Sequence, residues 1–523
     1  MHVLTNEQMQ RVDAETIDTV CPGLELMERA GRNVATFIRH RFEPEAHKAV
    51  VFVGPGNNGG DGLVIARYLC EAGWKCSVHL LKSPDKFTPD AAKNYQRFQK
   101  ILATNSEAVE YDANRPDWPD RVAEDTADAD VLIDSIFGTG VSGAPRGKAL
   151  EMIEFANSFP GPMVSVDIPS GVNGTTGEAR GEAILADYTV TIGAPKTGLL
   201  FHPGKSYAGE VTVVDIGFPE EVIAKHGGDV YLLDRVEAAY RLPPRAPDAH
   251  KFNAGTLVMI AGSDQYRGAA LLAAEAALRI GCGMVYLGVP ASIRPQVDLG
   301  LREAITFALP ETADGTVAED AGPVIARYLE RADALAIGPG MGRNEETDRF
   351  VRQFVTTAQK PVVVDADAIT AFAGRFDAIA SIPAHSVFTP HSGELKRLLE
   401  MDIPATAPER IDATLNMAKR LGCTLLHKGA PSLIADPTEG LWINTSGNSA
   451  LATGGTGDVL TGLVGGLLAQ GAGPMDAACT ASFVHGKAGE LAAEDHGVRG
   501  VIASDLLLYL GAAVLELEAI AGE

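Results

Sequence analysis

Residues 48–62 read KAVVFVGPGNNGGDG, in which a β-branched run leads directly into a glycine-rich turn. The residues that follow, 62–73, read GLVIARYLCEAG and are typical of a helix. A strand, a tight glycine turn and a helix in succession begin a βαβ unit, and the first amides of the helix can bind an anion. This stretch therefore predicts an α/β fold with an anion site at the helix N-terminus.

The same alternation of short β-branched runs and helical patterns continues over two long parts of the chain. It predicts right-handed βαβ units and a mostly parallel sheet covered on both faces. The expected strands of the first part are AVVFVG (49–54), CSVHLL (76–81), ADVLIDSIFG (129–138), MVSVDIPSG (163–171), YTVTIGAP (188–195) and EVTVVDIG (210–217). Those of the second part are GTLVMIAGS (255–263), GMVYLGVP (283–290), ALAIGPG (334–340), PVVVDAD (361–367), HSVFTPH (385–391) and CTLLHKG (423–429).

Between the two parts, residues 218–251 break this pattern. Residues 241–250 read RLPPRAPDAH, and their prolines cannot pair inside a sheet. A chain of 523 residues also exceeds what one hydrophobic core usually organises. We therefore expect two α/β domains, residues 1–224 and 230–523, of which the first is Rossmann-like with three αβα layers.

The overall composition is that of a folded, soluble protein, with 46% apolar and 21% charged residues. A net charge of −24 opposes general affinity for nucleic acids or anionic membranes. Six cysteines without C-x-x-C spacing, and an N-terminus without a signal pattern, favour reduced thiols in the cytoplasm. The longest uncharged stretch, Val459 to Met475, is rich in glycine and too short to span a membrane, and we expect it to form a buried helix.

The glycine-rich turn at residues 54–62 contains G-x-G-x-x-G in the context of a dinucleotide fold. An ordinary NAD site also has an acidic residue at the end of the next strand, about 20 residues further on. Here that strand ends in Lys82-Ser83-Pro84. The sequence therefore argues against a typical dehydrogenase.

Three motifs in order, NNGGDG at 57–62, DSIFGTG at 134–140 and VDIPSG at 166–171, resemble the NAD(P)H-hydrate epimerase domain. The resemblance implies one loop that holds the substrate's phosphates and a second loop that contacts the substrate. The first loop comprises Asn57, Asn58, Gly59, Gly60 and Asp61, and the second comprises Gly138, Thr139, Gly140, Val141, Ser142, Gly143 and Ala144. Small side chains and helix-start amides would let the backbone approach a pyrophosphate closely.

The resemblance also implies a potassium ion bound by Asn58, Asp134 and Ser170. Hard oxygen ligands suit an alkali cation. The alternative is that Asp134 and Ser170 only cap turns. Asp167 matches the family's catalytic and substrate-binding carboxylate, and it ends a strand, where open α/β sheets bind their ligands.

The implied reaction changes the configuration at C6 of a hydrated nicotinamide ring, where a hydroxyl lies next to nitrogen. Water can leave and return through an iminium-like species, and a carboxylate such as Asp167 can act as acid, base and charge stabiliser. Lys196, in GAPKTG, resembles the family's strand-end lysine. It either takes part in this chemistry or holds a phosphate or a surface position.

In the second part, residues 448–458 read NSALATGGTGD, small residues that open a helix and end in Asp458. The stretch resembles the G-x-G-D signature of ribokinase-like folds, in which the aspartate deprotonates a hydroxyl while helix-start amides stabilise the transferring phosphoryl group. Gly143 to Lys148 has the wrong glycine spacing for a Walker A motif, which excludes a P-loop enzyme.

Within that fold, residues 245–515 resemble NAD(P)H-hydrate dehydratase through AGSDQYRGAALLAAEAALRIGCG, IGPGMG, VVVDADAI, TPHSGE, HKGAPS and NTSGNSALATGGTGDVLTG. The resemblance implies nucleotide binding by Lys428, Gly429, Ala430, Pro431, Ser432 and Gly457. It implies contacts with the hydrated substrate at Ala254, Gly342, His391 and Asp458. The chain departs from the family's usual H-P-G-E at residues 391–394 and from H-K-G-x-x-G at residues 250–255, which affects the role of Ala254.

The two resemblances together imply repair of hydrated NADH or NADPH. The second domain would phosphorylate the C6 hydroxyl of the S epimer with ADP or ATP and Mg²⁺ and then eliminate phosphate. The resemblance also implies a homo-oligomer.

 

Two alternatives use the same motifs. The first is a small-molecule kinase, because the second domain's fold also serves that chemistry, and its fusion to an epimerase-like domain argues against it. The second is a nucleotide-binding scaffold without turnover, against which the retention of Asp167 and Asp458 argues.

Overall fold

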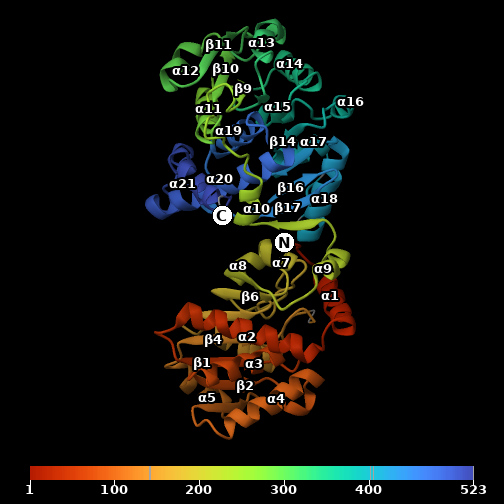
Figure 1. The fold of residues 1–523 in the computed structure, drawn as a ribbon, viewed down its shortest axis with the longest axis vertical. Helices are drawn as coiled ribbons and strands as arrows, with labels where there is room; N and C mark the ends of the chain where they lie inside the picture. The colour runs from red at the N-terminus through yellow and green to blue at the C-terminus, as the bar shows by residue number, and fades with distance from the viewer. Residues whose placement is uncertain (141–142, 401, 405, 522–523) are drawn as a thin grey trace. The chain divides into compact units, whose positions relative to one another are not determined.

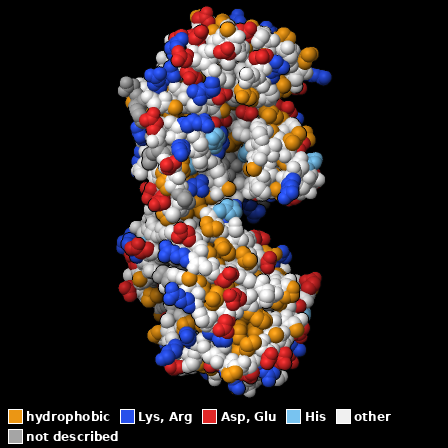
Figure 2. All heavy atoms as spheres, turned by 180° about the vertical axis from the view of Figure 1, so that it is seen from behind, with side chains coloured by type: hydrophobic (Ala, Val, Ile, Leu, Met, Phe, Trp, Pro, Cys, Tyr) orange, Lys and Arg blue, Asp and Glu red, His pale blue; other side chains and the backbone are white. Residues whose placement is uncertain are grey.

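The computed structural model describes residues 1–523 except 141–142, 401, 405 and 522–523 (Figure 1). It divides into two compact units, of which the first holds Met1–Val230 and the second begins at Tyr231. Among the described residues, no helix is long and apolar enough to cross a membrane. Figure 2 shows basic side chains interspersed with acidic ones on the visible face of each unit.

The sheet of the first unit is seven-stranded and parallel, in the order β3-β2-β1-β4-β5-β6-β7. Its strands are β1 (Lys48–Val53), β2 (Lys75–Leu80), β3 (Ala108–Asp112), β4 (Val131–Ser135), β5 (Met163–Val166), β6 (Tyr188–Ile192) and β7 (Glu210–Val214). Six of them coincide with the predicted strands. The edge strand β3 was not predicted, because its sequence AVEYD is short and half polar.

Helices cover both faces of this sheet, as the fold class predicted. The helices are α1 (Asn6–Thr19), α2 (Gly23–Phe42), α3 (Asn57–Glu71), η1 (Pro84–Lys86), α4 (Pro89–Leu102), α5 (Trp118–Thr126), α6 (Lys148–Asn157), α7 (Thr197–Leu200), α8 (Gly204–Ala208) and α9 (Glu220–Gly227). Successive strand residues face opposite sides. Val51 and Val53 pack in one cluster with α2, α3 and α4, whereas Val50 and Phe52 pack in another with α5 and α6.

Helix α1 has a well-defined start that fixes the residues it presents to the site. The Thr5 side chain accepts a hydrogen bond from the Gln8 backbone N–H, and the Gln8 side chain accepts one from the Thr5 N–H. This capping box satisfies two amides that the helix leaves free. Met9 and Val12 are buried on the apolar side of the helix.

The second unit is built on a ten-stranded sheet in the order β11-β10-β9-β12-β13-β14-β15-β16-β17-β8. From β11 to β15 the neighbours are parallel, and β15, β16 and β17 pair antiparallel. The strands are β8 (Val230–Leu233), β9 (Thr256–Ile260), β10 (Met284–Pro290), β11 (Ile305–Leu309), β12 (Ala334–Ile337), β13 (Val362–Val364), β14 (Ser386–Phe388), β15 (Thr424–His427), β16 (Ser432–Asp436) and β17 (Gly440–Asn444). The six predicted strands are present, whereas β8, β11, β16 and β17 were not predicted.

The helices of the second unit include a buried central one. They are α10 (Arg235–Tyr240), α11 (Arg267–Arg279), α12 (Arg294–Gly300), η2 (Glu319–Ala321), α13 (Gly322–Leu329), α14 (Glu345–Thr356), α15 (Ala366–Thr370), α16 (Phe376–Ile379), α17 (Ser392–Leu399), α18 (Ala407–Leu421), η3 (Ser449–Leu451), α19 (Thr456–Ala469), α20 (Pro474–His496) and α21 (Ala503–Ala521). The expected buried helix in 459–475 is α19, which ends at Ala469. The proline-rich segment 241–250 lies inside this unit, between α10 and β9.

Helices α11 and α19 approach each other closely at Gly462. A Cβ atom added there would lie 2.0 Å from the Ala273 carbonyl oxygen and 2.8 Å from the Ala276 Cβ. We expect Gly462→Ala to lower the free energy of unfolding by about 1–3 kcal/mol, because the two helices must separate. Gly268→Ala is the control, since Gly268 lies in α11 with open space around its Cβ position. Denaturant unfolding followed by circular dichroism measures both, and equal stabilities would contradict the close packing.

Candidate active sites in the two units

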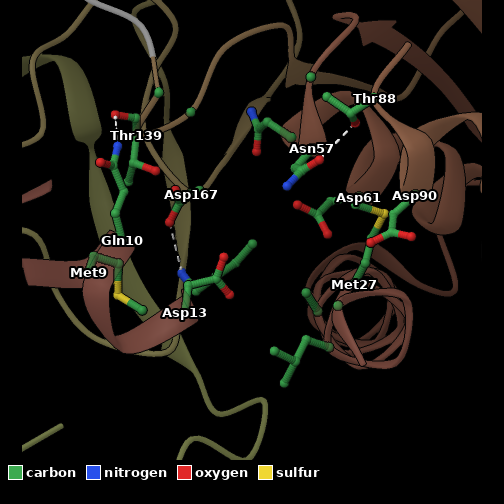
Figure 3. Close-up of a pocket in the computed structure, with 18 of the residues that line it drawn as sticks. Met9, Gln10, Asp13, Met27, Asn57, Asp61, Thr88, Asp90, Thr139 and Asp167 are labelled. Atoms are coloured by element: carbon green, nitrogen blue, oxygen red, sulfur yellow. Dashed lines mark hydrogen bonds between the residues drawn. The ribbon is translucent and has the colours of Figure 1, made fainter. Parts of the chain in front are cut away.

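A cavity of about 520 Å³ lies at the carboxyl ends of the strands of the first unit (Figure 3). Residues that follow β1, β4, β5, β6 and β7 line it, together with residues of α1 and α2. Strand β1 pairs with β2 on one side and with β4 on the other. The helices that follow β1 and β4 pack on opposite faces of the sheet, so the cavity lies at a topological switch point, where α/β sheets bind ligands.

The predicted catalytic Asp167 forms a buried ion pair at the edge of this cavity. Lys196 Nζ lies 2.5 Å from Asp167 Oδ1, and the lysine side chain is 1% exposed. The same ammonium donates to the Ile192 carbonyl oxygen at 2.7 Å and to Thr191 Oγ1 at 3.1 Å. Asp167 has φ of 68°, in the left-handed region that residues other than glycine rarely adopt. Strained backbone of this kind is common at functional sites.

The charged groups around the cavity are four carboxyl groups, of Asp13, Asp61, Asp90 and Asp167, and the single cation of Lys196. Asp90 forms an ion pair at 3.2 Å with Lys93, which does not line the cavity. Burial raises the pKa of Asp13, and the nearby charge of Asp167 raises it further. Burial raises the pKa of Asp61 well above its usual range, with Asp167 and Asp13 adding to the effect. Asp13 had no role in the sequence prediction.

The predicted phosphate loop forms the start of α3, and only part of it faces the cavity. Asn57, Asn58 and Asp61 line the cavity. A Cβ atom at Gly59 would lie 1.9 Å from the Gly54 carbonyl oxygen, and one at Gly60 would lie 2.5 Å from Met27 Sδ. These two glycines therefore allow α3 to pack closely on its neighbours, and the exposed amides belong to the helix start.

The predicted second substrate loop is divided by the structure. Gly138, Thr139 and Gly140 line the cavity, and the Thr139 carbonyl oxygen accepts hydrogen bonds from Asn6 and Gln10 of α1. Val141 and Ser142 lie outside the described residues. Gly143 lines a second hollow of about 230 Å³, which shares Phe137 and Gly138 with the cavity, and Ala144 is exposed.

The three predicted potassium ligands belong to one buried network. Both carboxylate oxygens of Asp134 accept hydrogen bonds, from Ser170 Oγ at 2.6 Å, from Ser170 N and Ser165 Oγ at 2.9 Å, and from Ile136 N at 3.1 Å. Burial raises the pKa of Asp134, and these hydrogen bonds oppose the rise. Asp134 and Ser170 therefore connect the turns that follow β4 and β5, a structural role of the kind that the alternative interpretation gave them.

The network continues through the loop that follows β4 to the start of α3. The Phe137 N–H donates to Ser170 Oγ at 2.9 Å, and the Phe137 carbonyl oxygen accepts from Asn58 Nδ2 at 2.8 Å. A Cβ atom at Gly138 would lie 3.3 Å from Asn58 Cβ and 3.5 Å from Asp167 Oδ2. Asn58, Asp134 and Ser170 are thus linked, directly or through Phe137, and Gly138 lies between this network and Asp167.

In the second unit, Asp458 lies in the first turn of α19, after a glycine-rich turn. Gly455 caps the helix with φ of 95°, which favours glycine. Burial raises the pKa of Asp458 to about 7, with Asp365 as the largest charged contribution, while Lys428 opposes the rise. A carboxyl group with this pKa can exchange a proton near neutral pH.

Lys428 connects Asp458 to the ends of neighbouring strands. Its Nζ lies 2.7 Å from Asp365 Oδ1 and 4.0 Å from Glu394 Oε2. Asp365 Oδ2 also accepts a hydrogen bond from Thr461 Oγ1 of α19 at 2.5 Å. Burial opposes the charged form of Lys428, but Asp365 and Glu394 outweigh it, and its pKa is raised. A Cβ atom at Gly457 would lie 3.5 Å from Lys428 Nζ, so the helix start and the lysine are adjacent.

Other predicted residues of the second unit lie at the same end of the sheet. Gly342 follows β12, and its N–H donates to Asp367 Oδ2 at 2.8 Å. His391 follows β14 and caps α17, where its Nδ1 accepts from the Gly393 N–H at 2.9 Å. The other predicted nucleotide-binding residues connect β15 to the start of β16, and they are Gly429, Ala430, Pro431 and Ser432.

Ala254 is the predicted residue that the structure does not bring to this site. It precedes β9, at the amino end of the strand, and it is buried. A Cβ atom at the neighbouring Gly255 would lie 2.3 Å from the carbonyl oxygen of Ala469, the last residue of α19. Asp458 is at the other end of that helix, roughly 16 Å along its axis. Residues 250–255, where the sequence departs from the family pattern, therefore lie far from Asp458.

The sequence prediction missed three groups that the structure places in these sites. Asp365 follows a strand just as Asp167 does, so the same signal could have found it. Glu394 lies in the quoted motif TPHSGE, but its distance from Lys428 depends on two different strands. Asp13 lies on an amphipathic helix before the first motif and carries no local signal.

Each half of the chain matches a known protein family. Residues 257–511 match the family described as NAD(P)H-hydrate dehydratase, and residues 23–198 match the family described as YjeF-related protein N-terminus. A bifunctional NAD(P)H-hydrate repair enzyme Nnr from Thermofilum pendens is 38% identical over 492 residues, covering 94% of this chain and 92% of that protein. The enzyme of the same name from Moorella thermoacetica is 36% identical over 522 residues, covering 99% and 97%.

A crystal structure of ADP/ATP-dependent NAD(P)H-hydrate dehydratase from Bacillus subtilis, co-crystallized with ATP/Mg²⁺, is 31% identical. It covers 55% of this chain and 99% of that chain, with a TM-score of 0.46. The repair enzyme from Escherichia coli is 34% identical over 507 residues, covering 96% of this chain and 92% of that protein. With such identity over nearly its whole length, the chain belongs to the family of bifunctional NAD(P)H-hydrate repair enzymes, which are epimerases and dehydratases of hydrated NAD(P)H.

Proposed function

We propose that the two activities are divided between the units, with epimerisation in residues 1–224 and dehydration in residues 230–523. The observation that carries this assignment is that each unit holds its own lysine-paired aspartate at the carboxyl edge of its own sheet. Each site draws its charged residues from one unit only. Hydrated NADH mixed with the protein and ADP tests the whole function, because repair restores the absorbance of the reduced nicotinamide.

In the first unit, Asp167 is proposed to act at C6 of the hydrated ring. Its carboxylate is held by Lys196 and can accept a proton and stabilise an adjacent cation. Loss of the C6 hydroxyl as water leaves an iminium-like ring, and addition of water to the opposite face gives the other epimer. Lys196 acts by holding Asp167, since all three of its N–H groups have acceptors.

The start of α3 is proposed to bind the phosphates of the substrate. A fifteen-residue helix with free amides at Asn57 and Asn58 offers N–H donors and the positive end of the helix dipole. The Asn57 side chain is held by a hydrogen bond from Thr88 Oγ1 at 2.7 Å. These groups lie on the same cavity wall as Asp61 (Figure 3).

The donor set at Asn58, Asp134 and Ser170 fits the potassium ion that the family resemblance implies. It consists of amide, carboxylate and hydroxyl oxygens, with the Phe137 carbonyl oxygen beside them. Oxygen donors with one negative charge suit an alkali cation. Such an ion would supply positive charge beside the loop that follows β4, and these residues would hold that loop against the substrate.

In the second unit, Asp458 is proposed to take the proton from the C6 hydroxyl of the S epimer. The hydroxyl oxygen then attacks the terminal phosphorus of ADP or ATP, releasing AMP or ADP, and amides at the start of α19 stabilise the transferring phosphoryl group. The C6–O bond next breaks, with its electron pair leaving on phosphate. The lone pair of the ring nitrogen assists this cleavage, and loss of a proton from C5 then restores the dihydronicotinamide.

The nucleotide is proposed to lie along residues 428–432 and Gly457. Lys428 can contact its phosphates because Gly457 lies beside its Nζ. Among the described residues, no group of three His, Cys, Asp or Glu side chains is arranged to hold a metal. We propose that Mg²⁺ is carried on the nucleotide phosphates, where it would neutralise phosphate charge.

The first prediction for this function concerns Asp458→Asn, which keeps the size of the side chain and removes the base. We expect dehydration to fall by at least about 100-fold, because a positioned general base typically contributes that much or more. Stabilisation of the protein by ADP and the epimerisation rate should both persist. Asparagine caps a helix about as well as aspartate. Near-normal dehydration by a well-folded variant would therefore contradict the catalytic role.

The second prediction concerns the pH dependence of dehydration. A base must be ionised to act, and with the pKa of Asp458 at about 7 the value of kcat/KM should rise as pH increases through about 7. Asp365→Asn removes the largest charge that raises this pKa, so the rise should move to lower pH. Asp367→Asn is the control and should move it less, because its contribution is smaller. Identical profiles for the wild type and Asp365→Asn would contradict the electrostatic coupling.

The third prediction tests the potassium site with Ser170→Ala. The variant removes one proposed ligand, and the potassium concentration that gives half-maximal epimerisation should rise. Ser165→Ala is the control, because Ser165 Oγ bonds to the same carboxylate at 2.9 Å but is not a proposed ligand. Both variants are measured by titrating the epimerisation rate with potassium, while sodium is varied to keep the ionic strength constant. Equal titration curves for the two variants would contradict the proposed potassium site.

A further inference from the structure

Asp13 lies on α1 and lines the same cavity as Asp167, yet it belongs to none of the sequence motifs. It also lies before residue 23, where the match to the N-terminal family begins. Met9, Gln10, Asp13 and Ile17 are spaced so that they share one face of the helix, and all four line the cavity. Figure 3 shows Asp13 on this helix beside Asp167, which comes from the end of β5.

The one lysine of the cavity has no donor left for Asp13. An ammonium group has three N–H donors, and those of Lys196 are occupied by Asp167, Thr191 and the Ile192 carbonyl oxygen. Within the described part of the chain, the Asp13 carboxyl group has no hydrogen bond or ion pair. Burial without a partner disfavours the anionic form of a carboxyl group.

Of the charges near Asp13, the Asp167 carboxylate acts in the same direction as burial, and the Lys196 ammonium opposes it. The carboxyl groups of Asp61, Asp90 and Asp167 line the cavity with it, and Lys196 is the one cation among the lining residues. Hydrated NAD(P)H brings further negative charge on its phosphates. Burial and Asp167 raise the pKa of Asp13, which favours its acid form. The cavity therefore combines one aspartate that is held by lysine with a second, half-buried aspartate that has no cation partner among the described residues.

We propose that Asp13 is the general acid of epimerisation and that it works with Asp167 as a two-carboxyl pair. This inference rests on the proposed assignment of epimerisation to the first unit. The proton of Asp13 passes to the C6 hydroxyl, the C6–O bond breaks with its electron pair on oxygen, and water leaves. The nitrogen lone pair forms the N1=C6 bond at the same time.

Water then adds to the opposite face of the ring. Its oxygen bonds to C6, the π electron pair returns to N1, and its surplus proton passes to the Asp167 carboxylate. The enzyme is left with Asp13 ionised and Asp167 protonated, which is the form that catalyses the reverse direction. Proton exchange with solvent restores the first form, so no proton is gained or lost over the cycle.

The test uses the full-length protein, without nucleotide so that the S epimer is not consumed, and follows interconversion of the purified epimers of hydrated NADH by chromatography. For Asp13→Asn we expect kcat to fall by about 100-fold or more in both directions, with KM little changed. The fall in wild-type rate at high pH, where Asp13 loses its proton, should disappear in the variant. Asp13→Glu should recover part of the rate.

Asp18→Asn is the matched control, because it removes a carboxylate from the exposed side of the same helix and should leave the rate unchanged. Thermal unfolding and nucleotide-dependent dehydration of the S epimer verify that each variant is folded. An Asp13→Asn rate within a few-fold of wild type would overturn the inference and leave the first unit's assignment standing. A rise in KM with unchanged kcat would also overturn it, because Asp13 would then only bind. A wild-type protein that does not interconvert the epimers would overturn the assignment itself.

Discussion

In each unit, one buried lysine pairs with one strand-end aspartate, and this pairing determines the charge of the site. Lys196 is bonded to Asp167 at 2.5 Å, and Lys428 is bonded to Asp365 at 2.7 Å. An ammonium that is paired with one carboxylate offsets the burial of the other carboxyl groups only in part. Burial raises the pKa of Asp458 to about 7, with Asp365 adding to the rise and Lys428 opposing it.

The parallel sheets bring these groups together by the close approach of neighbouring loops. A Cβ atom at Gly54, after β1, would lie 1.8 Å from the Ile136 carbonyl oxygen in the loop after β4. One at Gly338, after β12, would lie 1.8 Å from the Asp365 carbonyl oxygen in the loop after β13. Only glycine allows such contacts, and they fix the distance between side chains that end different strands. The same construction thus serves two unrelated reactions.

The sequence predicted the central strands well, because strands covered on both faces are continuous apolar runs. It did not predict β3, β8, β11, β16 and β17. Strand β3 lacks a continuous apolar run, and its residues after Ala108 are only half-buried. Among the site residues, it found those within local motifs, such as Asp134 and Asp458. It could not assign Asp365 to Lys428 or Asp13 to the cavity, because those contacts join segments far apart in the chain.

Asp61 is an acidic residue in the loop that we propose to bind the phosphates of the substrate. An ionised carboxylate beside a pyrophosphate would repel it, and the chain as a whole carries a net charge of −24. Burial, Asp167 and Asp13 raise the pKa of Asp61 well above its usual range, which favours its neutral form. A neutral carboxyl group can donate a hydrogen bond to a substrate oxygen. The burial and the neighbouring carboxyl groups that raise the pKa of Asp61 therefore also reduce the repulsion that it would otherwise exert on the proposed substrate.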